Sequence, residues 1–134
     1  MNKALKTVDT KHTLKSFDGG ITWNETGLNP TNTPSLMNDI YIHPSNSNIL
    51  WVATTSGVYK TTNGGTNWTN VQGGNIRDIK IKPGDPNTIY AVSSSTFYKS
   101  TNGGDSFSIS STGLPGTSGR LVIDVTPANP NVVY

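Results

Sequence analysis

The chain has no cysteine, which excludes both a disulfide framework and thiol chemistry. Charge is also scarce, because charged residues make up 13% of the 134 residues, against about 25% in an average domain. No apolar run approaches the roughly 20 residues that a membrane-spanning helix needs, and residues 1–20 lack the apolar stretch of a signal peptide. In a segment of a longer chain, the export signal would lie elsewhere. We expect no membrane span, and the composition is typical of an extracellular or cell-envelope β-protein.

Groups that hold cofactors, metals or nucleic acids are missing as well. The two histidines, His12 and His43, are solitary, and no calcium loop of the D-x-N-x-D-G type occurs. No Gly-Gly pair is followed by the Lys-Ser/Thr of a phosphate loop. Lysines gather near the start, but no aromatic residues are interleaved with them; they are Lys3, Lys6, Lys11 and Lys15. The sequence therefore predicts no cofactor, no metal and no nucleic-acid partner.

Against these absences stands one short signature that occurs three times. The copies begin at Ser16, Thr61 and Ser100, 45 and then 39 residues apart. Each has a hydroxyl residue, then Asp or Asn two places later, two glycines, and an aromatic residue five places after the Asp or Asn. The members are Asp18, Gly19, Gly20 and Trp23; Asn63, Gly64, Gly65 and Trp68; and Asn102, Gly103, Gly104 and Phe107. The period suits one four-stranded blade of a β-propeller.

The signature predicts a tight hairpin turn. Its glycines accept a positive φ, and an Asp or Asn side chain can hydrogen-bond the backbone two residues further on. The closing aromatic residue opens the next strand and can bury a large face against the hairpin. We therefore interpret the Asp and Asn residues of the signature as structural rather than catalytic.

A second pattern recurs between the turns. Residues 39–44, 78–83 and 123–127 alternate apolar and polar side chains and end at a proline, as a half-buried strand does. A more continuously apolar strand follows each of them. In this alignment Trp51 matches Ala91 and Tyr41 matches Lys80. An exposed Tyr41 or Trp51 could stack on a sugar ring, and burial between blades is the alternative.

Together these patterns resemble the Asp-box (BNR) repeat, whose signature is S/T-x-D/N-G-G-x-T/S-W/F. That repeat is known from β-propellers of sialidases, xyloglucan-cleaving glycoside hydrolases, sortilin-type receptors and photosystem assembly factors. The resemblance covers nearly the whole chain and implies an all-β fold, a partial propeller of four-stranded antiparallel blades. It also implies that the turn joins the third and fourth strands of a blade, at the edge away from the binding face. Asn63 and Asn102 replace the usual Asp.

The resemblance divides the chain into one propeller segment. Residues 1–26 would be a partial blade with strands at 4–9, 13–17 and 22–26; residues 38–71 and 77–110 would be whole blades, and 121–134 would begin another. Three blade-equivalents do not close a ring, since propellers use four to eight blades. Two interpretations follow: the segment belongs to a longer chain that supplies the remaining blades, or copies join head to tail, because Leu5 aligns with Val133.

Candidate ligand-binding residues lie where the inner strands begin. Asp39 and Asp78 occupy equivalent positions there, Arg77 precedes Asp78, and Arg120 stands just before the third inner strand. The inner strands of a propeller begin at the central channel and its mouth, where ligands bind. An Asp that recurs once per blade can instead bridge neighbouring blades, so both interpretations stay open. The long connections 24–38 and 112–120 end at the same places and can build a ligand face.

The function predicted first is non-catalytic binding of a glycan or protein partner by an exported propeller. A polysaccharide hydrolase of the xyloglucan-cleaving kind is the alternative, and a purely structural or assembly scaffold is the third. A glycosidase needs two carboxyl groups about 5–5.5 Å or 6.5–9.5 Å apart. A sialidase-like site is not expected, because that family places three arginines around the sugar carboxylate and this chain has two arginines.

Overall fold

The structure, a computed structural model, describes residues 12–31, 35–115 and 119–134. Ten strands and no helix lie within these residues, so none of them forms a helix long and apolar enough to cross a membrane. The strands are β1 (Leu14–Lys15), β2 (Asn24–Glu25), β3 (Met37–Ile42), β4 (Leu50–Thr54), β5 (Gly57–Thr61), β6 (Thr69–Gly73), β7 (Asp78–Ile81), β8 (Ile89–Val92), β9 (Phe97–Ser100) and β10 (Ser108–Ile109).

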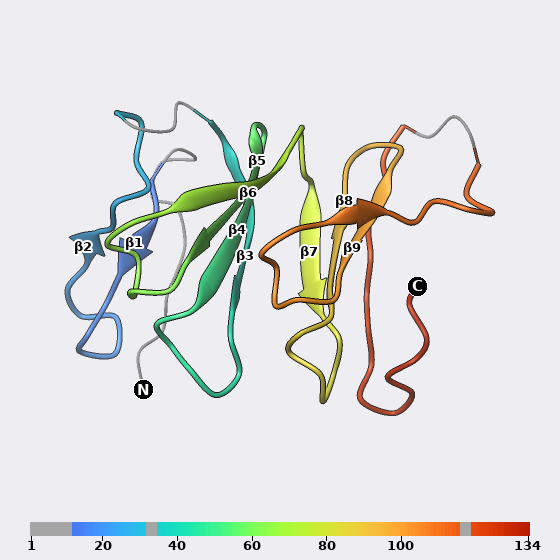
Figure 1. Cartoon of the computed structure of the whole chain (residues 1–134). Coiled ribbons are helices and arrows are strands. Elements are labelled where there is room, and N and C mark those ends of the chain that lie inside the picture. The colour runs from blue at the N-terminus through green and yellow to red at the C-terminus, as the bar shows by residue number, and fades with distance from the viewer. Residues whose placement is uncertain (1–11, 32–34, 116–118) are drawn as a thin grey trace.

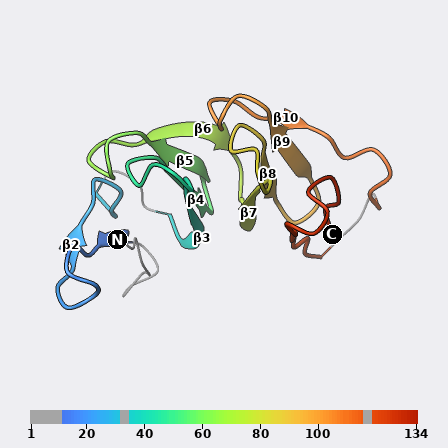
Figure 2. The same cartoon turned by 90° about the horizontal axis from the view of Figure 1, so that it is seen from below.

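All the strand pairs are antiparallel and form three sheets. Two sheets have four strands each, in the orders β3-β4-β5-β6 and β7-β8-β9-β10, and β1 pairs with β2 alone. Figure 2 shows the sheets side by side along an arc, with β3 and β7 on the concave side and β6 and β10 on the convex side. The predicted fold class, an all-β partial propeller of four-stranded antiparallel blades, is confirmed.

The main core lies between the two four-stranded sheets. Alternate residues of β4 point to opposite faces of the strand, and Trp51 and Ala53 join the cluster that faces the second sheet. The other fully enclosed members of this cluster are Val58, Ile76, Ile79, Ile81, Ile89 and Ala91. Every residue of β4 and of β8 is buried, which is why these two strands read as continuously apolar.

The two ends of the arc contain less regular structure. β1 and β2 have two residues each, and the strand expected at 4–9 and the residue Leu5 lie outside the described residues, as do Lys3, Lys6 and Lys11. Residues 121–134, the red end of the chain, lie against the second four-stranded sheet (Figure 1) and close on themselves through one bridge, Val125 to Val133. Asp124 and Tyr134 exchange two backbone hydrogen bonds of 3.0 Å beside that bridge.

Candidate functional site

The three signature turns share one hydrogen-bond network. In the second turn, the Thr61 hydroxyl donates to Asn63 Oδ1 at 2.9 Å and accepts from the Gly65 N–H at 3.1 Å. Asn63 Oδ1 also accepts from the Asn67 N–H at 2.9 Å. Equivalent bonds join Ser16, Asp18, Gly20 and Thr22 in the first turn and Ser100, Asn102, Gly104 and Ser106 in the third. Because Asn makes the same bonds as Asp, its replacement of Asp leaves the turn intact.

The second and third turns each join the third strand of a four-stranded sheet to the fourth, and each also touches the preceding sheet, whereas the first turn joins β1 to β2. Lys60, on β5, donates from Nζ to the Gly103 carbonyl at 2.7 Å and pairs with Asp105 at 2.6 Å. Lys15, on β1, reaches the Gly64 carbonyl at 3.4 Å in the same way. A lysine of one sheet therefore binds the backbone of the next turn along the arc, a contact that the sequence patterns did not reveal.

The inner strands carry a compact charged cluster of Asp39, Asp78 and Lys80. The Lys80 ammonium lies 3.0 Å from Asp39 Oδ2 and also contacts Asp78 Oδ1. The two carboxyl groups therefore share one ammonium group, and all three side chains are no more than 30% exposed. Sequence reasoning named both carboxylates but missed Lys80. Its position two residues after Asp78 was the available signal, because residues i and i+2 of a strand share a face.

Both carboxylates also bond to the backbone of the next inner segment. Asp39 Oδ2 accepts from the Ile79 N–H at 3.3 Å, and Asp78 Oδ2 accepts from the Ile123 N–H at 3.2 Å. Each carboxylate therefore links its own sheet to the next inner segment. Bridging of this kind was one of the two interpretations of Asp39 and Asp78 that the sequence allowed, and ligand binding was the other.

The cluster shifts the pKa values of its two carboxyl groups in opposite directions. Burial raises the pKa of Asp39, and its hydrogen bond to Asp78 adds to that effect. Burial also opposes ionisation of Asp78, but hydrogen bonds from Asp39, Lys80 and the Ile123 N–H outweigh it and lower the pKa. The Lys80 pKa is raised, because its bonds to Asp78 and Asp39 outweigh the burial that would lower it. Asp78 is thus the more acidic of the two carboxyl groups that bind Lys80.

Arg77 and Arg120 are placed differently from the carboxylates. Both side chains are exposed, and neither makes a hydrogen bond or ion pair with the described residues. Arg77 lies directly before β7, so it stands at the edge where the inner strands begin; its backbone N–H bonds to the Val92 carbonyl at 2.7 Å. We call the edge of the sheets at which β3 and β7 begin, together with Arg77 and Arg120, the inner-strand edge. The two arginine side chains there are available to a ligand that carries hydroxyl or carboxylate groups.

The aromatic residues considered as sugar platforms are largely enclosed. Trp51 is 1% exposed, and Tyr41 is half-buried against the main core. The pairing also corrects the sequence alignment: Trp51 lies opposite Lys60 on β5, and Tyr90, not Ala91, lies opposite Lys99 on β9. Trp51 is therefore an inter-sheet residue rather than a surface platform. Among the described residues, no group of three or more His, Asp or Glu side chains is placed to hold a metal ion.

No protein-family model and no curated protein matches the chain. Among solved structures, an ancestral GH74 enzyme matches with a TM-score of 0.77 and 25% identity, over 94% of this chain and 19% of that one. A GH74 enzyme from Niastella koreensis matches with a TM-score of 0.61 and 31% identity, over 73% of this chain and 18% of its own. YCF48 from Cyanidioschyzon merolae, at 17% identity and a TM-score of 0.69, covers 93% of this chain and 42% of its own. The chain spans about a fifth of the two GH74 enzymes.

Proposed function

We propose that this chain is a segment of an exported Asp-box propeller that binds polysaccharide at the inner-strand edge without cleaving it. The observation that carries the non-catalytic part is the cluster around Lys80. Asp39 and Asp78 both bind the Lys80 ammonium, whereas the two carboxyl groups of a glycosidase stand about 5–9.5 Å apart with the scissile bond or a water between them. Asp39 Oδ2 and Asp78 Oδ2 also accept from the backbone N–H groups of Ile79 and Ile123.

The polysaccharide part rests on the likeness to the two GH74 enzymes, at 25% and 31% identity. The signature turns of this chain lie at the outer edge, so they leave the inner-strand edge free for a ligand. Arg77 and Arg120 are the exposed donors there. A neutral sugar offers hydroxyl acceptors to such guanidinium groups, and a uronic acid offers a carboxylate.

Hydrolysis is the second candidate, and one observation favours it. The pKa of Asp39 is raised while that of Asp78 is lowered, and acid and base carboxyl groups in hydrolases are separated in this way. For this pair to act, the carboxyl groups would have to part and release the backbone N–H groups that they hold.

Binding of xyloglucan oligosaccharides, measured by titration calorimetry, tests the proposal. The double variant Arg77→Ala/Arg120→Ala should lose about tenfold or more in affinity, because each charge-assisted hydrogen bond contributes about 1.5–3 kcal/mol. Lys82→Ala is the control, since Lys82 follows the far end of β7 and bonds to Asn131. Absence of binding by the unaltered chain overturns the glycan assignment, and release of reducing ends would favour hydrolysis instead.

A further inference from the structure

Two of the three signature turns contain an asparagine directly before a glycine, Asn63 before Gly64 and Asn102 before Gly103. Asparagine is a thermolabile residue, and a following glycine favours its breakdown, because glycine has no Cβ to shield the backbone nitrogen that attacks the side chain. Both asparagine side chains are exposed, so water reaches them. Both turns lie within the two four-stranded sheets, between β5 and β6 and between β9 and β10.

The backbone around the two asparagines is the same. Gly64 and Gly103 both have a φ of +69°. The Gly64 N–H donates to the Asn48 carbonyl at 2.9 Å, and the Gly103 N–H donates to the Asn87 carbonyl at the same distance. This hydrogen bond restrains the attacking nitrogen equally in both turns. A difference in reactivity between the turns therefore comes from the surrounding side chains.

The side-chain amide group is held in the third turn and free in the second. Asn102 Nδ2 donates to the Ser106 hydroxyl at 2.9 Å. The second turn has Asn67 where the other two turns have a hydroxyl residue. Among the residues that the structure describes, Asn63 Nδ2 has no hydrogen-bond partner, although Asn63 Oδ1 is bonded as in the other turns. To turn toward the glycine nitrogen, Asn63 breaks one hydrogen bond fewer than Asn102.

The residue before Asn67 or Ser106 adds to the difference. Thr66 donates from its hydroxyl to the Asn63 carbonyl at 3.1 Å. That carbonyl shares a conjugated peptide unit with the Gly64 nitrogen, so the bond withdraws charge and makes the Gly64 N–H more acidic. In the third turn Asp105 stands at this place, and its carboxylate, which pairs with Lys60, has no proton to donate. Both differences favour reaction in the second turn.

We propose that Asn63 is a site of spontaneous deamidation and that its counterpart Asn102 is protected. The Gly64 nitrogen loses its proton to the solvent and forms a bond to Asn63 Cγ. The Cγ–Nδ2 bond then breaks, and the amide group takes up a proton and leaves as ammonia. Water opens the cyclic imide that remains. The net reaction consumes water, releases ammonia and needs no oxidant, reductant or further reactant.

The imide opens at either of its two carbonyl carbons, with different consequences for the turn. Opening at Cγ gives aspartate at position 63, which the turn accepts, because Asp18 makes the same bonds in the first turn. Opening at the main-chain carbonyl gives isoaspartate, which adds a methylene group to the backbone. The bonds of Asn63 to Thr61 and Asn67 close over short distances in the chain, so isoaspartate does not keep them. One product preserves the turn and the other opens it.

Peptide mapping by mass spectrometry tests the proposal on the folded 134-residue chain, incubated near neutral pH in water enriched in heavy oxygen. Asn63 should convert about fivefold faster than Asn102 or more, since one net hydrogen bond corresponds to about a fivefold change in rate. In urea, where both turns are open, the two rates should converge. No conversion of Asn63 in the folded chain overturns the proposal, and so do equal rates there or faster conversion of Asn102.

Exchanging side chains between the turns tests the cause. Asn67→Ser supplies the hydroxyl that Asn63 Nδ2 lacks and should slow conversion of Asn63 about fivefold. Ser106→Asn removes that hydroxyl from the third turn and should speed conversion of Asn102 by a similar factor. Thr66→Val keeps the shape of the side chain without its hydroxyl and should also slow conversion of Asn63. Rates that none of these variants changes overturn the proposal.

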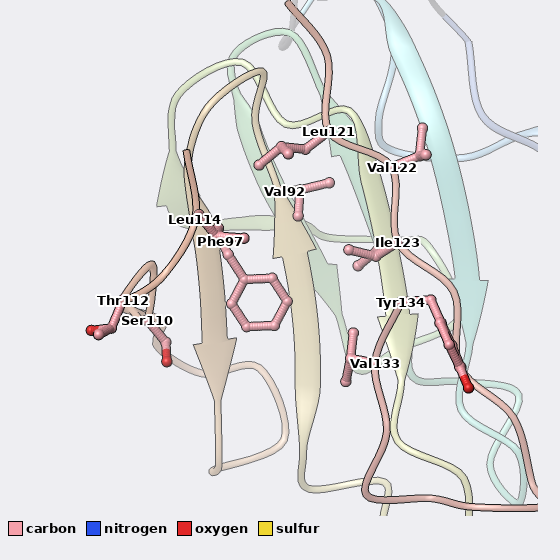
Figure 3. A pocket seen from close by; sticks show the side chains of 10 residues that line it. All are labelled: Val92, Phe97, Ser110, Thr112, Leu114, Leu121, Val122, Ile123, Val133 and Tyr134. Carbon is pink, nitrogen blue, oxygen red and sulfur yellow. The ribbon is translucent and has the colours of Figure 1, made fainter. Parts of the chain in front are cut away.

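A control variant separates local opening of the turn from unfolding of the whole chain. Val92 is fully buried and lines the apolar groove shown in Figure 3. It pairs with Phe97, at the end of β9 away from the third turn. Val92→Ala should lower the stability of the fold and leave the ratio of the Asn63 and Asn102 rates unchanged. If Val92→Ala instead raises both rates to one value, the reaction proceeds from the unfolded chain and the proposal is overturned.

Discussion

The outer turns and the inner strands repeat to different degrees. At the outer edge, the three signature turns share their hydrogen bonds almost atom for atom. At the inner strands the aspartate, the two isoleucines and the closing proline recur, but Tyr41 stands where Lys80 stands, and the register shifts between Met37 and Asp39 in β3 but not in β7. The residues that recur from sheet to sheet hold the arc together. The positions that do not recur have no such common role, so they can differ with a ligand.

Distance along the chain explains the difference. Each outer turn is closed by bonds between residues two to four apart, so a short sequence specifies it completely. The inner cluster joins residues about 40 apart, such as Asp39 and Ile79, and therefore depends on how two sheets are placed. Three predictions follow, in order of expected effect.

Gly104→Ala should cause the largest loss of stability and should differ most from the same substitution in another turn. The added Cβ would lie 2.3 Å from Trp51 Nε1, at a residue with φ of +74°. Overpacking costs about 1–3 kcal/mol and the left-handed backbone about 1–2 kcal/mol, so we expect about 3 kcal/mol of lost stability in urea unfolding. Gly20→Ala, in the same place of the first turn, meets only its own Trp23 at 3.5 Å and should lose about 1 kcal/mol. Equal losses would contradict the close Trp51 contact.

At the inner strands, Asp78→Asn should cost more stability than Asp39→Asn. The Asp78 pKa is lowered, so its carboxylate carries the charge that Lys80 needs, whereas the Asp39 pKa is raised. We expect a loss of about 2 kcal/mol for Asp78→Asn at neutral pH and less than about 1 kcal/mol for Asp39→Asn, by urea unfolding. The reverse order would show that Asp39 holds the charge. These paired variants also separate inter-sheet bridging from ligand binding, since glycan affinity should survive both.

The smallest effect concerns Asp18, which occupies the position that Asn63 and Asn102 hold in the other two turns. Hydrogen bonds from the Thr22 side chain and backbone, and from Ser16, lower the pKa of Asp18 from 3.8 to about 2. Because the folded pKa is depressed, this contribution to stability is present above pH 3.8 and is lost as the pH falls through 2. Asp18→Asn, which copies the other two turns, should remove that pH dependence and lower stability slightly near neutral pH, because an amide oxygen accepts the same hydrogen bonds without the charge.

The measurement is the free energy of unfolding of the unaltered protein and of Asp18→Asn, compared from pH 5 to pH 2, a range that includes the pKa of Asp18 in the folded protein. Asn63→Asp is the reciprocal variant and should introduce a dependence of the same sign. A pH profile that Asp18→Asn leaves unchanged would contradict the role of the turn in holding the carboxylate ionised.

The fold class could be predicted from the sequence because its determinants are local. The signature turns place a strand on either side, and proline ends each inner strand, so the order of strands follows from Gly64, Gly65 and Pro83 alone. The lengths of β1 and β2 could not be predicted in this way. Two residues of pairing each reflect the packing at that end of the arc rather than the propensity of the segment.

The candidate site was predictable only in part. The recurrence of Asp39 and Asp78 indicated their shared position, but their mutual contact required the separation between neighbouring sheets. Trp51 was matched to Ala91 at an offset of 40 residues, whereas the offset of 39 that joins Asp39 to Asp78 continues through the turn and places Trp51 on Tyr90. Ligand binding by Arg77 and Arg120 stays a prediction.

The lysine contacts between sheets have a consequence for how such a chain can change. Lys60 and Lys15 bind carbonyl oxygens of the turns, at Gly103 and Gly64, and carbonyls are the same whatever side chains surround them. A sheet that keeps its turn can therefore still bind the lysine of the preceding sheet, even when its other residues differ. Units joined through their backbones are interchangeable, so duplication, loss or exchange of a whole blade preserves the joints of the arc.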